Sequence, residues 1–167
     1  MEIATTTIKE LRNQTSAGVM ACRAALIEAK GDMTEAVKLL EKQSLVEARK
    51  KVDRQASQGL VEAYIHTGGR IGVLIEVNCE TDFVANTDEF KSLAHNLAMQ
   101  VAAQDPCYLT PEEVPEGTEC HPETDCLLVQ PFIKDPTKNI QDIISETIAK
   151  TGENIKIRRF ARYELGV

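Results

Sequence analysis

The sequence contains no tryptophan, and it has only four phenylalanines and three tyrosines. We therefore expect a core built mostly from Ile, Leu, Val and Ala. No apolar run approaches the roughly 18 residues that suggest a membrane-spanning helix, and the N-terminus lacks the basic and apolar stretches of a secretory signal. With 43% apolar and 27% charged residues the composition is globular. These features predict a cytoplasmic protein.

Motifs for common catalytic and cofactor sites are also missing. The sequence has no phosphate-binding G-x-x-x-x-G-K-[ST] loop, no dinucleotide-binding G-x-G-x-x-G and no nucleophile elbow. Its three histidines, His66, His95 and His121, lie far apart and share no catalytic spacing. We therefore expect a protein that is not an enzyme, that binds no nucleotide directly and that needs no cofactor.

The cysteines argue against both a disulfide framework and a metal site. There are five, an odd number, and they are spread along the chain. The densest group is Cys120, His121 and Cys126, with Cys107 upstream. Zinc sites favour two cysteines separated by two to four residues, whereas five residues, including Pro122, separate Cys120 from Cys126. Free thiols and no bound metal are expected.

Negative charge predominates, and it is unevenly distributed. The net charge of −7 divides into +2 for residues 1–54 and −9 for residues 55–167. Residues 105–126 contain seven acidic residues and no Lys or Arg. This balance argues against a nucleic-acid partner, because such proteins are usually basic.

One short basic segment keeps an RNA-binding alternative open. Lys156, Arg158 and Arg162 would share one strand face with Phe160, and Arg159 stands beside them. Basic side chains around an aromatic are typical of single-stranded nucleic-acid binding.

Residues 1–45 predict three short helices with tight turns. Thr7 to Glu10 form a capping-box pattern, followed by a turn at residues 16–18. Asp32 to Glu35 open a third helix in the same way. Residues 46–57 read as a helical, solvated connector. A three-helix unit of this kind also suggests a binding module for peptides or ubiquitin-like folds.

The hydrophobic period changes from 3.6 to 2 after the connector, which indicates an α+β domain over residues 58–167. Alternating residues 61–66 and 71–78 flank Gly68-Gly69 and predict a β-hairpin. A helix follows from Asp88, then a long acidic loop at 105–126 with at most one helical turn. A short edge strand is expected at 127–132, a helix capped by Asn139, and a last strand with Ile155, Ile157, Ala161, Tyr163 and Leu165 on one face. The expected fold is a small, largely antiparallel sheet with helices on one face.

Phe83 is the residue that is hardest to explain as plain structure. It follows the polar turn residues Glu80 to Asp82, between a strand and a helix. One interpretation is that Phe83 tucks under the next helix as part of the core. The other is that it is an aromatic anchor for a pocket on a partner protein.

Several stretches together carry a family resemblance. The clearest are N-C-E-T-D-F-V-A at 78–85 and I-K-E-L-R-N-Q-T-S-A-G-V-M-A-C-R-A-A-L at 8–26. Y-I-H-T-G-G-R-I-G-V-L-I-E-V at 64–77, G-E-N-I-K-I-R-R-F at 152–160 and Q-P-F-I-K-D at 130–135 add to them. In this order they resemble the short members of the bacterial elongation factor Ts family, guanine-nucleotide exchange factors for elongation factor Tu.

The resemblance implies a mechanism and site residues. Residues 1–45 would be a domain like the ubiquitin-associated fold that grips the GTPase, with contacts from Gly18, Val19, Met20 and Arg23. Residues 58–167 would be the core domain, in which Thr81, Asp82, Phe83 and Val84 push on the GTPase near its nucleotide. Phe83 would act as a wedge that disturbs the Mg²⁺ site and releases GDP. A core of about half the length found in long members would leave a surface for a second copy, hence a homodimer.

The chain also departs from the family pattern. Ser16 replaces a common Gly, Ala21 an acid, Arg23 a Lys, and Asn86 a basic residue after T-D-F-V-A. The acidic loop at 105–126 stands where many relatives carry a helical insertion. These departures affect individual polar contacts and leave the overall pattern intact.

Overall fold

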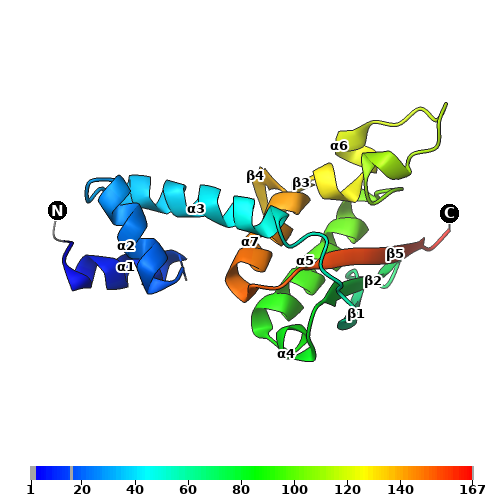
Figure 1. Cartoon of the computed structure of the whole chain (residues 1–167). Helices are drawn as coiled ribbons and strands as arrows, with labels where there is room; N and C mark the ends of the chain where they lie inside the picture. The colour runs from blue at the N-terminus through cyan, green and yellow to red at the C-terminus, as the bar shows by residue number, and fades with distance from the viewer. Residues whose placement is uncertain (1–2, 16, 167) are drawn as a thin grey trace. The chain divides into compact units, whose positions relative to one another are not determined.

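The computed structural model describes residues 3–15 and 17–166 (Figure 1). The chain divides into two compact units, residues 1–51 and 52–167. The second unit begins just after the end of a long helix, and each unit has a core of its own. No helix in the described ranges is both long and apolar enough to cross a membrane.

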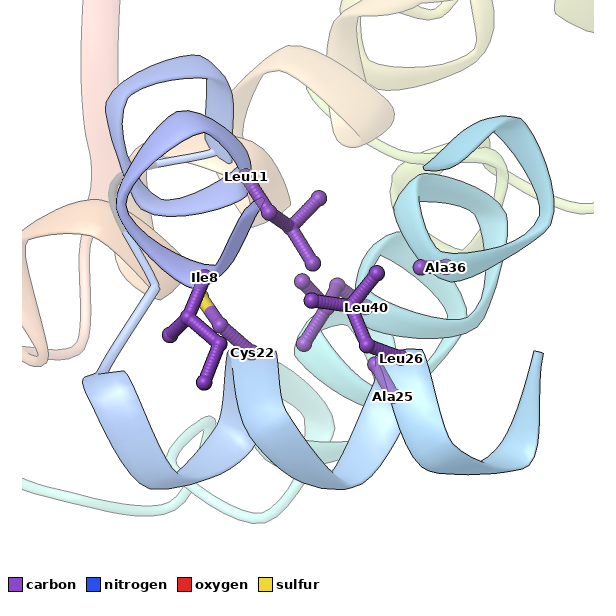
Figure 2. Packing of buried hydrophobic residues seen from close by; sticks show 7 residues of the cluster. All are labelled: Ile8, Leu11, Cys22, Ala25, Leu26, Ala36 and Leu40. Atoms are coloured by element: carbon purple, nitrogen blue, oxygen red, sulfur yellow. The ribbon is translucent and has the colours of Figure 1, made fainter. Parts of the chain in front are cut away.

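Three helices form the first unit: α1 (Thr5–Thr15), α2 (Val19–Glu28) and α3 (Met33–Arg49). Figure 2 shows side chains from all three pointing toward one another. The buried cluster consists of Ile8, Leu11, Cys22, Ala25, Leu26, Ala36 and Leu40. Small residues on α2 and α3 allow the three helices to pack closely around Leu11 and Leu26, which are fully buried.

The helix boundaries correct two expectations for this unit. Helix α1 begins at Thr5, so Thr7 lies inside the helix and does not cap it. Helix α3 continues beyond residue 45 to Arg49, so only the first part of the expected connector at 46–57 is helical. The Asp32 cap is present, since its Oδ1 accepts a hydrogen bond from the Glu35 amide at 3.0 Å. Ser16, where the expected turn begins, lies outside the described residues.

The second unit contains a three-stranded antiparallel sheet in the order β1-β2-β5. Its strands are β1 (Gln58–Ile65), β2 (Ile71–Cys79) and β5 (Lys156–Glu164). Helix α5 (Asp88–Gln104) packs on one face of this sheet, and α7 (Ile140–Thr151) packs against α5. The α+β class with helices on one side of a small antiparallel sheet is confirmed.

The faces of the edge strands differ from the expectation. Val61 and Ile65 of β1 lie on the uncovered face, 64% and 66% exposed. In β5, the register shifts opposite the step from Glu76 to Val77, and Arg158 is the extra residue. This bulge puts Ile157 on the covered face, whereas Ala161 and Tyr163 alternate to the other face. The expected single face of Ile155, Ile157, Ala161, Tyr163 and Leu165 is therefore wrong.

The segment between α5 and α7 contains more local structure than the sequence indicated. The acidic loop at 105–126 includes two single-turn helices, η1 (Pro111–Glu113) and α6 (Pro122–Asp125), where at most one turn was expected. The expected strand at 127–132 is mostly a third such turn, η2 (Leu127–Val129). Only β3 (Pro131–Phe132) is extended, and it pairs with β4 (Asp135–Asn139) in a separate two-stranded sheet. A short apolar run does not by itself distinguish a strand from a buried helical turn.

Candidate functional site

A single helical turn, α4 (Asp82–Ala85), connects β2 to α5. Thr81 is its N-cap, because the Thr81 hydroxyl oxygen accepts a hydrogen bond from the Val84 amide at 3.4 Å. At the other end, the Asn86 side-chain amide donates to the Asp82 carbonyl at 2.9 Å. The backbone of this short turn is therefore held at both ends by side chains.

The turn buries two of its apolar side chains and displays the third. Val84 and Ala85 are buried at 9% and 7% exposure, whereas Phe83 is 83% exposed. The interpretation that Phe83 tucks under the next helix is therefore wrong. Asp82, also exposed, lies next to Phe83. A large apolar ring on an anchored turn has the geometry of an anchor for a pocket on another molecule.

Thr81 is also held by hydrogen bonds to Glu153, in the turn between α7 and β5. Both carboxylate oxygens of Glu153 accept hydrogen bonds from Thr81, one from the amide at 2.9 Å and one from the hydroxyl at 2.6 Å. The Cys79 thiol donates to the Thr81 carbonyl at 3.0 Å. Burial raises the pKa of the Cys79 thiol, and the nearby Glu153 carboxylate raises it further, so Cys79 remains a neutral donor. Sequence reasoning missed Glu153, because 72 residues separate it from Thr81 and no local pattern connects them.

The four residues expected to contact a partner from the first unit lie together at the start of α2. Gly18 is the N-cap of the helix and has an extended backbone. Val19 and Met20 are 49% and 71% exposed, and Gly18 and Arg23 are exposed as well. Cys22 points the other way, into the core. This end of α2 thus presents two apolar side chains and one cation to solvent.

The cysteines of the acidic segment include one close pair. The sulfur atoms of Cys120 and Cys126 lie 4.0 Å apart, with Cys126 buried and Cys120 half-buried. Desolvation and the hydrogen bond to Cys126 raise the pKa of the Cys120 thiol to about 11. Within residues 3–15 and 17–166, no three His, Cys, Asp or Glu side chains are grouped as metal ligands. His121 directs its backbone amide, at 2.8 Å, to the Asp125 carboxylate.

The basic residues of β5 do not form the expected continuous stripe. The bulge at Arg158 breaks the alternation, and Arg162 lies on the covered face with Phe160, so the predicted common face with Lys156 and Arg158 is wrong. Arg162 forms ion pairs with Asp105 at 3.4 Å and Glu164 at 2.8 Å. Glu76 faces the two other arginines, Arg159 at 2.8 Å and Arg158 at 3.8 Å. Acids of the same unit therefore offset most of this positive charge.

Fold and surface together define a class: a two-unit α+β protein that presents apolar groups from a helix start in one unit and from an anchored turn in the other. Comparison with known proteins gives the family. The family model described as "Elongation factor TS" matches residues 1–123. The chain belongs to the elongation factor Ts family, and it is thus a translation elongation factor.

Individual relatives match over nearly the whole chain. The elongation factor Ts of Moorella thermoacetica is 50% identical over 194 residues, covering 98% of this chain and 96% of the relative. That of a Thermoanaerobacter species is 48% identical, with 95% and 93% covered. That of Thermotoga petrophila is 47% identical, with 99% and 98% covered. Because this chain has 167 residues, an alignment over 194 means that the relatives contain segments it lacks.

Proposed function

We propose that this protein promotes the release of GDP from elongation factor Tu. The observation that carries the proposal is Phe83, which is 83% exposed on a capped turn whose neighbours Val84 and Ala85 are buried. The three relatives and the family model all carry the name elongation factor Ts. The family resemblance implies elongation factor Tu as the partner, and the proposal adopts it. The cytoplasmic location expected from the sequence stays a prediction.

The proposed action requires no nucleotide site on this chain. In GTPases of this type, Mg²⁺ bridges the nucleotide phosphates and a hydroxyl of the phosphate-binding loop, so disturbing it weakens the hold on GDP. Phe83, with Thr81, Asp82 and Val84 around it, would press on the GTPase near that ion. A thousandfold faster release requires about 4 kcal/mol, and a buried aromatic anchor supplies an energy of this order. Coupling is reciprocal, so GDP weakens the grip of this protein by the same factor.

The first unit would provide the second contact. Val19 and Met20 expose apolar surface beside Arg23 at the start of α2, with Gly18 leaving the backbone accessible. In this proposal the first unit binds the GTPase and the second inserts Phe83, which agrees with a chain of two compact units. A small RNA-binding protein is less well supported, because acids pair with Arg158, Arg159 and Arg162.

The test is release of a fluorescent GDP analogue from elongation factor Tu, with and without this protein. Phe83→Ala should keep the fold and lose most of the stimulation, because the ring contributes contact area only in the complex. Leu93→Ala provides a core control: Leu93 is 3% exposed on α5, and its truncation should cost roughly 2–5 kcal/mol of stability. Val129→Ala removes another exposed apolar side chain and should leave exchange unchanged. If Phe83→Ala stimulates release like the wild type, the wedge assignment is wrong.

We also propose that the uncovered face of the sheet associates with a second copy of the chain. Within the second unit as described, α5 covers one face, whereas Val61, Ile65, Leu74, Tyr163 and Leu165 are exposed on or beside the other. Several of these residues line a shallow apolar hollow at the end of the sheet. Monomeric proteins seldom expose a contiguous apolar patch of this kind.

A further inference from the structure

Glu153 lies at the turn between α7 and β5. It is far in sequence from Phe83 but contacts Thr81, the N-cap of the turn that carries Phe83. Its Oε2 accepts the Thr81 amide at 2.9 Å, and its Oε1 accepts the Thr81 hydroxyl at 2.6 Å. One carboxylate thus fixes both the backbone and the side chain of a single residue. Hydrogen bonds to an ionised acceptor are stronger than those between neutral groups.

Thr81 transmits this contact to the turn that carries Phe83. Its hydroxyl donates its proton to Glu153, which leaves a lone pair to accept the Val84 amide at 3.4 Å. The Thr81 carbonyl accepts the Cys79 thiol at 3.0 Å and the Ala85 amide at 3.3 Å. Every polar group of Thr81 is therefore bonded, and the orientation of its hydroxyl is set by Glu153.

The turn needs such external support. Helix α4 has only four residues, and a helix of this length does not sustain itself, because nucleation fixes several dihedral angles for few hydrogen bonds. Its position must come from the groups that hold it. Val84 and Ala85 hold its underside, and Glu153 holds its beginning.

The backbone next to Glu153 is held in place by hydrogen bonds of Asn154. The neighbouring Asn154 is 1% exposed, and its amide donates to Glu80 Oε1 at 2.7 Å. The Asn154 side-chain amide donates to the carbonyls of Val52 and Arg54 at 3.0 and 2.7 Å. Movement of the Glu153 carboxylate is therefore restricted to its own side chain.

We infer that Glu153 is a positioning residue for the Phe83 wedge. It holds the turn in one conformation before the partner binds, so that the turn loses little conformational entropy on binding. A contact group that is preorganised loses less conformational entropy when it binds, which raises affinity without adding a contact. This inference rests on the proposed exchange function and concerns the same site.

The experiment measures stimulated release of a fluorescent GDP analogue across a range of concentrations of the full-length protein. Glu153→Ala should keep the melting temperature close to that of the wild type and reduce stimulation at subsaturating concentration by about tenfold, because the turn must then be ordered during binding. Glu153→Gln retains one acceptor oxygen, so its stimulation of GDP release should lie between that of the wild type and that of Glu153→Ala. The matched control is Glu146→Ala, which removes an α7 carboxylate paired with Lys138 at 2.6 Å and should leave stimulation unchanged.

The decisive measurement is the same change in the Phe83→Ala background. If Glu153 acts through Phe83, adding Glu153→Ala to Phe83→Ala should cause no further loss. A general structural role would instead reduce stimulation by the same factor in both backgrounds, and that result would overturn the inference. Stimulation by Glu153→Ala alone at the level of the wild type would also overturn the inference. Failure of the proposed function looks different, because the wild type itself would then not accelerate GDP release.

Discussion

At the scale of single residues, the same chemical type takes opposite roles according to its surroundings. Phe90 is fully buried at the start of α5, whereas Phe83, seven positions earlier, is 83% exposed. The difference lies in the turn, since α4 buries Val84 and Ala85 and leaves its second residue to solvent. Exposure of a large ring carries a solvation cost, and a ring kept exposed on a fixed turn is a strong indication of a binding role.

Gly59 provides a prediction about stability at this scale. Its φ is +141°, and a Cβ there would overlap the Val77 carbonyl oxygen and approach the Asn78 Cα to 2.7 Å. Gly59→Ala should therefore lower the free energy of unfolding by more than about 1 kcal/mol. Gly117→Ala is the control, because Gly117 also has a positive φ, +83°, but faces open space. Equal loss for both in chemical denaturation would show that the overlap with the Val77 carbonyl adds no cost beyond that of the positive φ.

At the scale of elements, local capping explains where the helices of the second unit begin and end. Asn139 and Asp142 form a reciprocal capping box at the start of α7, with bonds of 2.8 and 3.1 Å. Gly152 ends the helix at φ +78°. The Asn139 cap was predictable from the sequence, because the signal lies within a few residues. Two of the single-turn helices of residues 105–129, η1 and α6, begin with a proline, but their N-cap residues and that of η2 make no side-chain cap hydrogen bond. Contacts such as the parallel bridge between Tyr108 and Cys126 also hold this segment.

Cys120 gives this segment a testable pH dependence. Desolvation and its bond to Cys126 raise the pKa of the Cys120 thiol from 9.0 to about 11. The folded state thus favours the neutral thiol, a contribution to stability that is complete below pH 9 and is lost between pH 9 and 11. Alkylation of Cys120 by iodoacetamide should be slow at pH 8 and should accelerate toward pH 11, measured by peptide mass spectrometry. The Cys120→Ser variant should lose less stability than the wild type between pH 9 and 11. An alkylation rate of Cys120 at pH 8 equal to that of an unfolded thiol would contradict the raised pKa.

At the scale of the whole molecule, association between copies concerns the face of the sheet in the second unit that α5 does not cover. Leu74 lies at its centre on β2, opposite Ala63 of β1 and Ala161 of β5, and is 47% exposed. Small neighbours on both sides leave the Leu74 side chain accessible. A symmetric pair of such faces would bury the same patch on each copy.

The dimer prediction follows from this arrangement. The wild type should sediment as a dimer at micromolar concentration, and Leu74→Glu should sediment as a folded monomer, because it places a charge at the centre of the interface. Lys91→Glu, an exposed charge change on α5, should leave the dimer intact. A wild type that stays monomeric at high micromolar concentration in light scattering would refute the proposal.

Features that depend on neighbouring residues were predictable from the amino-acid sequence. The 3.6-residue period predicted the three-helix unit, the two-residue period predicted the hairpin, and Asp32 and Asn139 capped the helices that follow them. The polar turn before Phe83 was also readable, because its turn residues Glu80 to Asp82 are adjacent, whereas the helical turn capped by Thr81 was not predicted. So was the family, through motifs spread along the chain.

Which faces are covered and which distant groups meet follow from the packing of the folded chain. The pattern of β1 did not reveal that Val61 and Ile65 face away from α5, because alternation gives two faces and not their surroundings. The bulge at Arg158 reversed the face of later residues in β5, an effect that depends on pairing with β2. Glu153 reaches Thr81 across 72 residues, and no local rule predicts such a contact, since it exists only once β5 is placed beside β2.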